Sequence, residues 1–462
     1  MTGSAAVRAL VLAAALLALA ACSRDDARAT RDVRPSSILL VTIDTLRADH
    51  VHAYGYPRAT TPNLDRLAAE GVLFETAYAP SSATGPSHAT LFTARQPIGH
   101  GVVQNGIPLD ASIPTLASLL AAAGYRTAAF VSSYPVSSAF GFANGFAHYD
   151  DSFDAGGGTM VSRRWERAGG SDAALDRRAT ATVERVEEWL AKTSDGTPTF
   201  LWVHLFDPHA PYVPPPPYDT AFTTPGAGHR EAEIDRYDGE IRYTDEQLGR
   251  LVAAFERTAG SRRGLVVVTS DHGEGLWDHG YPGHNRDVWE EEVRVPLVLR
   301  WQDGVPGGRR VSEPVHLIDV LPTLLAAAGA GAPPAGTSGT NLLAVLRGEQ
   351  ELSPERAIHL TRPYFGERGR RRRLQQKGWG FGIRRGDWKA IVARDEGRLD
   401  LFDLARDPDE RRDLAPDAPA RADALAAEVE AWREAQVAAR GGTLPPVPRD
   451  VRRKLRALGY VQ

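Results

Sequence analysis

Short apolar runs and longer amphipathic segments alternate along the chain. The apolar runs have the length and β-branched character of strands buried on both faces; they are Ser37–Ile43, the run that ends before Pro80, Thr127–Ser132, Phe200–Phe206, Leu265–Thr269 and Pro296–Leu299. Between them lie segments with helical periodicity, at Pro62–Gly71, Ile113–Ala123, Asp172–Lys192, Ile234–Phe255 and Asp319–Ala328. Strands that alternate with helices predict an α/β fold, with a doubly wound, mostly parallel sheet flanked by helices.

The pattern changes after the last of these helices. Residues 329–340 are rich in Gly, Pro and Ala, which is typical of a connection. We therefore predict a boundary near residue 345, between a main domain at 37–345 and a C-terminal subdomain at 346–462. The second part contains short strands, such as Gly386–Val392, and a helix at Ala418–Ala438, which together predict a smaller α+β subdomain.

The N-terminus has the pattern of an export signal. Arg8 precedes the apolar run Ala9–Ala21, which is too short to span a bilayer as a stable helix. The run ends in Leu-Ala-Ala-Cys and resembles a bacterial lipobox, in which the cysteine is lipidated and becomes the mature N-terminus. We predict a signal peptide at 1–21 and a polar tether at 22–36. The protein would then be periplasmic or in the cell envelope, anchored to a membrane through Cys22.

Composition agrees with an exported globular protein. Of the 462 residues, 42% are hydrophobic and 24% are charged, and Cys22 is the only cysteine, so no disulfide can form within the chain. A formal net charge of −4 provides no field that would attract nucleic acid. The basic run RGRRRR at 368–373 is interpreted as a solvated loop, with contact to an anionic substrate or lipid headgroup as the alternative.

Polar side chains follow three of the predicted strands at their carboxyl ends. They are Asp44, then Asp207 and His209, then Asp271 and His272. In open α/β sheets the functional site lies in the crevice at these strand ends. Two carboxylates and one imidazole, from Asp44, Asp271 and His272, suit a divalent transition metal such as Zn²⁺ or Mn²⁺, with Ca²⁺ as the alternative.

A hydroxyl-bearing loop stands before a predicted helix. Residues Thr84–His88 (TGPSH) precede Ala89–Thr93, where helical sequence begins. A helix N-terminus supplies backbone N–H groups and the positive end of a dipole, so it attracts an anion. A hydroxyl held there beside a metal ion can be deprotonated and oriented for attack on phosphorus or sulfur. The alternative is a Thr or Ser that only caps the helix.

Several of these stretches, in this order, resemble the sulfatase family of the alkaline phosphatase superfamily. The blocks are LLVTIDTLRADHVHAYGY, SSATGPSHATLFTARQP, HLFDPHAPYVPP, VVVTSDHGEGLWDHGYPGH, VWEEEVRVPLVL and LFDLARDPDERRDLA, which cover roughly residues 37–415. The resemblance implies an ester hydrolase in which Asp44, Asp271 and His272 hold one divalent metal ion. Thr84 would be the nucleophile and a further ligand.

The resemblance also implies roles for residues outside the metal set. His209 would bind the transferred group or protonate the leaving oxygen. Asn105 and His284 would contact the substrate oxyanion, as in the phosphonate monoester hydrolase branch. His88 stands where the family signature Cys/Ser-x-Pro-x-Arg has its Arg, and is a candidate substrate contact. Arg47 is a further candidate, with a structural ion pair as its alternative.

Thr84 and His88 mark the departure from the sulfatase pattern. Sulfatases oxidise the Cys or Ser of the signature to formylglycine, whereas the methyl group on Cβ of threonine would make the same oxidation product a ketone. Because the signature Arg is also replaced, we expect no formylglycine. A threonine alkoxide must release its covalent adduct by attack of water, which suits a phosphoryl group better than a sulfuryl group. We therefore predict phosphate mono- or diesters or phosphonate esters, of a small molecule, glycan or lipid, as substrates.

Three alternative functions stay open: hydrolysis of sulfate esters despite Thr84, transfer of a phospho-headgroup, and binding without catalysis on an inactive scaffold. A second metal ion could be held by Asp207, His209 and His284, but the Asp-Pro-His spacing favours a single ion. The remaining histidines near these motifs are interpreted as structural; they are His204, His279 and His316.

Overall fold

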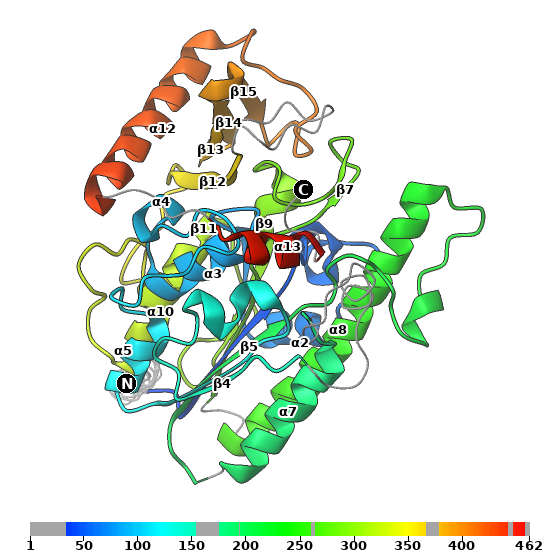
Figure 1. Cartoon of the computed structure of the whole chain (residues 1–462), viewed down its shortest axis with the longest axis vertical. Coiled ribbons are helices and arrows are strands. Elements are labelled where there is room, and N and C mark those ends of the chain that lie inside the picture. The colour runs from blue at the N-terminus through cyan, green and yellow to red at the C-terminus, as the bar shows by residue number, and fades with distance from the viewer. Residues whose placement is uncertain are drawn as a thin grey trace, which may run out of the picture. The chain divides into compact units, whose positions relative to one another are not determined.

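The computed structural model describes residues 34–153, 175–193, 195–259, 264–365, 378–441 and 447–457 (Figure 1). Within these ranges, nine strands form a mixed central sheet. In spatial order they are β10 (Arg309–Val311), β2 (Val72–Tyr78), β9 (Arg294–Arg300), β6 (Gly264–Ser270), β1 (Ser37–Ile43), β5 (Thr199–Leu205), β3 (Arg126–Phe130) and β4 (His148–Asp150), while β11 (Val315–His316) pairs with β2. β9 runs antiparallel to β2 and β6, and the other pairs in this sheet are parallel. The predicted α/β class with a mostly parallel sheet is confirmed.

The central strands owe their position to their uniformly apolar sequences. β6, β1 and β5 lie side by side and are buried along their whole length. Such β-branched runs suit a strand that is covered on both faces. Leu39, Val41 and Ile43 belong to a core that includes residues of α7 and α8. Because neighbouring residues of a strand point to opposite faces, Thr42 points into the other layer.

Helices cover both faces of the sheet. On the first face, α8 (His229–Ala259) packs against α2 (Pro62–Glu70) and α7 (Ala179–Lys192). On the face of Thr42, α3 (Thr84–Thr93), α5 (Leu116–Ala122) and α10 (Val320–Ala328) pack against one another. The other α-helices are α4 (Pro97–His100), α9 (Glu290–Val293), α11 (Leu342–Leu346) and α13 (Arg449–Ala457). Single turns of 3₁₀ helix lie at Ala48–His50, His52–Tyr54, Tyr134–Val136, Ser138–Phe140, Tyr218–Thr220, Leu317–Asp319 and Arg394–Glu396.

A second, antiparallel sheet follows in the C-terminal part of the chain. Its strands are, in order, β12 (Ile358–Phe365), β13 (Gly378–Arg385), β14 (Trp388–Ala393) and β15 (Arg398–Asp403). The long helix α12 (Pro419–Arg440) packs on this sheet, as Figure 1 shows, and shares a hydrophobic core with it. The prediction of a smaller α+β part is therefore confirmed. A two-stranded ladder of β7 (Gly275–Leu276) and β8 (Pro282–Gly283) leads to His284.

Some predictions differ from the structure or fall outside it. α3 begins at Thr84, five positions before the expected start at Ala89, because a proline in the first turn of a helix costs no intrahelical hydrogen bond. The predicted signal peptide and the lipidation site Cys22, most of the tether and the basic run at 368–373 lie outside the described residues. In the part of the chain that is described, no helix is both long and apolar enough to cross a membrane.

Buried histidines outside the strand-end region predict that the protein loses stability in acid. Burial lowers the pKa of His100 to about 3 and that of His316 to about 4, from an ordinary value of 6.5. The unfolded chain therefore binds protons that the folded chain does not. The free energy of unfolding should be highest above pH 6.5 and fall as the pH drops from 6.5 toward 4. Each such histidine contributes up to about 1.4 kcal/mol per pH unit in this window.

Urea unfolding of the metal-free protein at pH 7 and pH 5 measures this loss, and His316→Asn is the matched variant. His316 Nδ1 accepts a hydrogen bond from the backbone N–H of Ile318, and the amide oxygen of Asn can take over that bond. We expect the variant to lose less stability than wild type between the two pH values. An equal loss in both proteins would contradict the role of His316.

Candidate active site

Three neighbouring strands bring polar side chains to one edge of the sheet. Ile43 of β1 pairs with Leu205 of β5 and with Ser270 of β6, so the three strands end at the same level. Asp44 and Asp271 directly follow two of these paired residues. Their carboxylates consequently emerge side by side, at the carboxyl ends of parallel strands where α/β proteins place their sites.

Asp44, Asp271 and His272 form a buried cluster of donor atoms. His272 Nε2 lies 3.6 Å from Asp44 Oδ1 and 3.5 Å from Asp271 Oδ2, and one donor atom from each residue lies within 4.8 Å of the other two. All three side chains are fully buried. Burial and the negative charge of Asp44 raise the pKa of Asp271, and within the described residues Asp271 Oδ2 accepts no hydrogen bond. Two adjacent buried carboxylates fit a divalent cation, which would neutralise them.

The hydrogen bonds of His272 leave the correct nitrogen for a metal ion. Nδ1 lies 2.9 Å from the carbonyl oxygen of Gly273, which can only accept, so Nδ1 carries the proton. Nε2 therefore presents its lone pair to Asp44 and Asp271, as in metal-binding histidines whose orientation is set by a backbone carbonyl. Burial lowers the pKa of His272, but Asp271 and Asp44 raise it further, so that it lies above its ordinary value. The cluster thus attracts positive charge.

Thr84 is the first residue of α3, and its hydroxyl points toward this cluster. Thr84 Oγ1 lies 3.2 Å from His272 Nε2, and the residue is fully buried. Asn105 Oδ1 accepts a hydrogen bond of 2.6 Å from the backbone N–H of Gly85, which ties the start of α3 to a neighbouring loop. Asn105 Nδ2 is buried and makes no hydrogen bond to the described residues. An anion beside Thr84 would therefore meet the positive end of the α3 dipole and an amide donor.

Two further imidazoles lie next to the cluster. The ring centroid of His284 is 4.4 Å from that of His272 and 4.9 Å from that of His209. His284 Nδ1 lies 2.9 Å from Glu274 Oε1, and His209 Nδ1 lies 2.6 Å from the carbonyl oxygen of Ala210. Burial lowers the pKa of His209 to about 4 and that of His284 well below its ordinary value. The Ala210 bond leaves a lone pair on His209 Nε2, which can accept a proton.

His88 lies on the protein side of Thr84. Its Nδ1 is 2.8 Å from the carbonyl oxygen of Thr84, and its Nε2 is 2.9 Å from Thr42 Oγ1. Burial lowers the pKa of His88 to about 4, so the ring is neutral at pH 7. This placement favours a role in holding the start of α3 over the substrate contact that we expected. His88 also does not replace the positive charge of the Arg in the family signature.

The guanidinium of Arg47 is bound by protein groups. It donates two hydrogen bonds to the carboxylate of Asp49, and others to Asp278 Oδ2 and to the carbonyl oxygen of Glu274. The side chain is buried. Of the two roles considered for Arg47, the structure favours the structural ion pair over a contact with substrate.

The set Asp207, His209 and His284 does not come together as a second metal site. Asp207 Oδ1 lies 2.6 Å from Arg178 Nη1, and Asp207 Oδ2 accepts a hydrogen bond of 2.8 Å from the backbone N–H of Ala179. The carboxylate thus caps α7 and forms an ion pair. Among the described residues, no group of metal-binding donors includes it. Asp207 is therefore held by protein groups in the structure.

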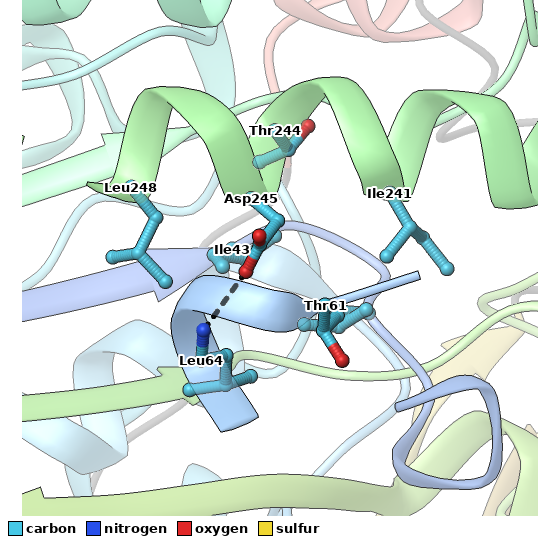
Figure 2. A pocket seen from close by; sticks show the side chains of 8 residues that line it. Ile43, Thr61, Leu64, Ile241, Thr244, Asp245 and Leu248 are labelled. Atoms are coloured by element: carbon cyan, nitrogen blue, oxygen red, sulfur yellow. Dashed lines mark hydrogen bonds between the residues drawn. The ribbon is translucent and has the colours of Figure 1, made fainter. Parts of the chain in front are cut away.

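A small cavity, shown in Figure 2, has none of these site residues in its lining. It is lined by Ile43, Leu46, Thr61, Leu64, Ile241, Thr244, Asp245 and Leu248, which come from β1, α2, α8 and adjoining loops. Asp245 accepts hydrogen bonds from the backbone N–H groups of Asn63 and Leu64 at the start of α2. The mostly apolar lining and this cap indicate a packing gap, and we place no ligand there.

His204 and Glu274 are the residues that the sequence interpretation missed. His204 Nε2 lies 3.5 Å from Asp44 Oδ2, although the residue was expected to be structural. It pairs in register with Thr42, so it points to the face of α3. The available signal was its place near the carboxyl end of β5, a strand that leads into the site. Glu274 orients His284 through its carboxylate. It stands only two positions after His272, and this closeness to a predicted metal ligand in the sequence could have marked it as a site residue.

Comparisons with known proteins agree with this geometry. The family model described as Sulfatase matches residues 36–330, and the model described as N-sulphoglucosamine sulphohydrolase, C-terminal, matches residues 277–433. Steryl-sulfatase of Mus musculus is 27% identical over 89% of this chain and 84% of its own length. The multifunctional alkaline phosphatase superfamily protein PehA of Trinickia caryophylli is 27% identical over 67% of this chain and 77% of its own.

The fold agrees as well. The crystal structure of phosphonate monoester hydrolase of Agrobacterium radiobacter superimposes with a TM-score of 0.71 at 24% identity, covering 87% of this chain and 96% of that one. The Sulfatase model spans more than half of the chain. The chain belongs to the sulfatase family.

Proposed function

We propose that this sulfatase-family hydrolase is metal-dependent and cleaves phosphate mono- or diesters or phosphonate esters, with Thr84 as its nucleophile. The observation that carries the proposal is the position of Thr84 Oγ1. It lies at the start of α3, 3.2 Å from His272 Nε2 and beside the buried carboxylates of Asp44 and Asp271. A threonine in this place cannot become the aldehyde on which sulfate release depends in formylglycine enzymes. It can form and release a phosphoryl ester.

Asp44, Asp271 and His272 would hold the metal ion, with Thr84 Oγ1 as a further donor. A divalent ion bound there would lower the pKa of the Thr84 hydroxyl and withdraw negative charge from the transferred group. The donor set of two carboxylates and one imidazole fits Zn²⁺ or Mn²⁺, and Ca²⁺ is the alternative. Asn105 Nδ2 and the start of α3 would stabilise the oxygens of the transferred group. Glu274 would keep His284 turned toward the same group.

The proposed reaction needs a group that transfers a proton, and His209 would be this group. Thr84 Oγ1 forms a bond to phosphorus while the bond from phosphorus to the leaving oxygen breaks. The neutral imidazole of His209 would take up the proton of the Thr84 hydroxyl and pass it to the leaving oxygen. Water then attacks phosphorus, the bond from phosphorus to Thr84 Oγ1 breaks, and one proton of the water returns to Thr84 Oγ1. His209 would thus act first as a general base and then as a general acid, using the same proton.

Hydrolysis of sulfate esters is the second candidate function. Steryl-sulfatase is among the relatives, and both matching family models have sulfate-releasing enzymes in their descriptions. Structures of similar fold have been solved in complex with glycans, including a carrageenan-derived oligosaccharide and a disulfated glucosamine. A glycan ester is therefore a reasonable substrate class under either candidate.

A substrate panel separates the two functions. The purified protein, loaded with Zn²⁺, Mn²⁺ or Ca²⁺, is assayed on aryl sulfate, aryl phosphate, bis-aryl phosphate and aryl phosphonate ester with the same leaving group. We expect kcat/KM for at least one phosphorus ester to exceed that for the sulfate by about 10²-fold, since water attack on a sulfated threonine is slow. A higher value for the aryl sulfate would reject the phosphoester function and support the second candidate.

We also propose that the protein works outside the cytoplasm on a lipid anchor. The support comes from the N-terminal pattern alone, in which an apolar run ends in Leu-Ala-Ala-Cys22. Glycan and lipid esters of the cell envelope would then be within reach of the site. Phospho-headgroup transfer onto such a molecule remains an alternative to hydrolysis, and differs only in the acceptor that replaces water.

A further inference from the structure

A second buried cluster lies behind the proposed metal site. Donor atoms of His88, His204 and Asp271 all lie within 4.8 Å of one another, and the three side chains are fully buried. By composition this cluster could hold a second metal ion. A histidine can bind a metal only through a nitrogen that carries no proton, so the hydrogen bonds of the two rings decide the question.

Both ring nitrogens of His88 are already used. Nδ1 donates to the carbonyl oxygen of Thr84 at 2.8 Å, because a carbonyl can only accept. Nε2 therefore accepts from Thr42 Oγ1 at 2.9 Å, and Thr42 Oγ1 in turn accepts from Trp202 Nε1 at 3.0 Å. This chain of bonds leaves no lone pair on His88 for a metal ion.

The ring of His204 is fixed in the opposite tautomer. The backbone N–H of Ser132 lies 3.4 Å from His204 Nδ1, and an N–H group can only donate, so Nδ1 carries the lone pair. Ser132 Oγ donates a hydrogen bond of 2.6 Å to the carbonyl oxygen of His204, which holds the two residues together. The proton of the neutral ring is thus on Nε2. This atom makes no hydrogen bond to the described residues, and it lies 3.5 Å from Asp44 Oδ2, so the contact between them is electrostatic.

Asp44 therefore has two differently placed oxygens. Oδ1 lies 3.6 Å from His272 Nε2, on the side of the metal cluster, and Oδ2 lies toward His204. Polar groups beside a metal-binding carboxylate set its orientation and tune metal affinity.

We propose that His204 is a positioning residue whose Nε2–H, 3.5 Å from Asp44 Oδ2, attracts that oxygen and so directs Asp44 Oδ1 to a single metal ion, and that the cluster of His88, His204 and Asp271 binds no ion. The inference rests on the proposed metal site, but it does not depend on whether the substrate is a phosphate or a sulfate ester. From residue type alone, His204 would be assigned as a metal ligand; the inference makes it a residue that positions a ligand.

Metal titration tests the proposal without any substrate. Metal-free wild type, His204→Leu, His204→Gln and His100→Leu are titrated with Zn²⁺ and with Mn²⁺ by calorimetry, and the bound metal is counted after dialysis. We expect one ion per chain in every variant. The Kd should rise by about 10- to 100-fold in His204→Leu. In His204→Gln, whose amide N–H can replace Nε2–H, the Kd should return most of the way to the wild-type value. In His100→Leu the Kd should equal that of wild type, since His100 is buried outside the site.

Two results would overturn the proposal. Two ions per wild-type chain, with one lost in His204→Leu, would make His204 a metal ligand. An unchanged Kd in a folded His204→Leu would make the residue merely structural. Nitrogen-15 NMR of wild type gives an answer even if a variant fails to fold, because it should show Nε2–H on His204 and Nδ1–H on His88 and His272. If wild type binds neither Zn²⁺ nor Mn²⁺, the metal site of the proposed function is rejected instead.

Discussion

Replacing Thr84 by alanine is expected to lower kcat on the best phosphoester substrate by about 10³-fold or more, with the metal ion still bound. The change removes only the hydroxyl and one methyl group from a fully buried position at the start of α3. Asp44, Asp271 and His272 are left in place, so loss of turnover would report the missing nucleophile. Steady-state kinetics on purified, metal-loaded protein measure the effect.

Two companion experiments make the Thr84 result specific. Thr84→Ser keeps a hydroxyl at the same place, and it should retain activity within about 10-fold of wild type. Rapid quenching of wild type during turnover should also yield a peptide containing Thr84 with one added phosphoryl group. If Thr84→Ala keeps full turnover, or the label appears on another residue, the assignment of the nucleophile is wrong.

Replacing Asp271 by asparagine is expected to change stability in opposite directions without and with metal. In the metal-free protein, Asp271 and Asp44 are buried together, and this raises the pKa of Asp271. A carboxyl whose pKa is raised by folding opposes folding as the pH rises above the pKa of the unfolded chain, and fully once the pH exceeds the raised value. At pH 7 its replacement by a neutral amide should therefore raise the free energy of unfolding. With saturating metal the order should reverse, because wild type gains stability from binding and the variant loses this gain.

Thermal unfolding with and without Zn²⁺ or Mn²⁺ measures both effects, and calorimetry gives the metal affinity. We expect the Kd of Asp271→Asn to rise by at least about 10²-fold, since one anionic ligand is removed. Asp207→Asn is the matched control, because Asp207 also follows a central strand but binds Arg178 and caps α7. Its metal affinity should equal that of wild type. A large loss of affinity in this control would favour the two-metal site that the structure does not support.

Much of the fold could be predicted because its central strands and amphipathic helices have strong local patterns. β1, β5 and β6 are apolar along their length, and only strands covered on both faces have this composition. The position of Asp44 and Asp271 at one sheet edge followed from this, since parallel strands end at a common edge. The start of α3 was placed too late, because Gly85 and Pro86 read locally as loop residues although the first turn of a helix tolerates them.

The histidines show where local patterns stop being informative. His88, His204, His209 and His284 are equivalent in a sequence, as imidazoles near strand ends or in loops. The tautomers of His88 and His204 differ in the structure: the Thr84 carbonyl, four positions away, puts the proton of His88 on Nδ1, whereas the backbone N–H of the distant Ser132 puts that of His204 on Nε2. Asp207 shows the same limit, since it stands beside His209 in the sequence but turns to Arg178 and α7.

The sequence by itself therefore determined the α/β class, the residues with metal-binding chemistry and the presence of Thr84 where sulfatases carry an oxidised residue. These depend on periodicity, composition and residue identity, which are local properties of the chain. Only the tertiary structure decided which donors converge, which carboxylates are neutralised by arginine, and which nitrogen of His204 carries the proton. Burial and hydrogen-bond partners set these properties, and both arise from contacts between segments that are far apart in the sequence.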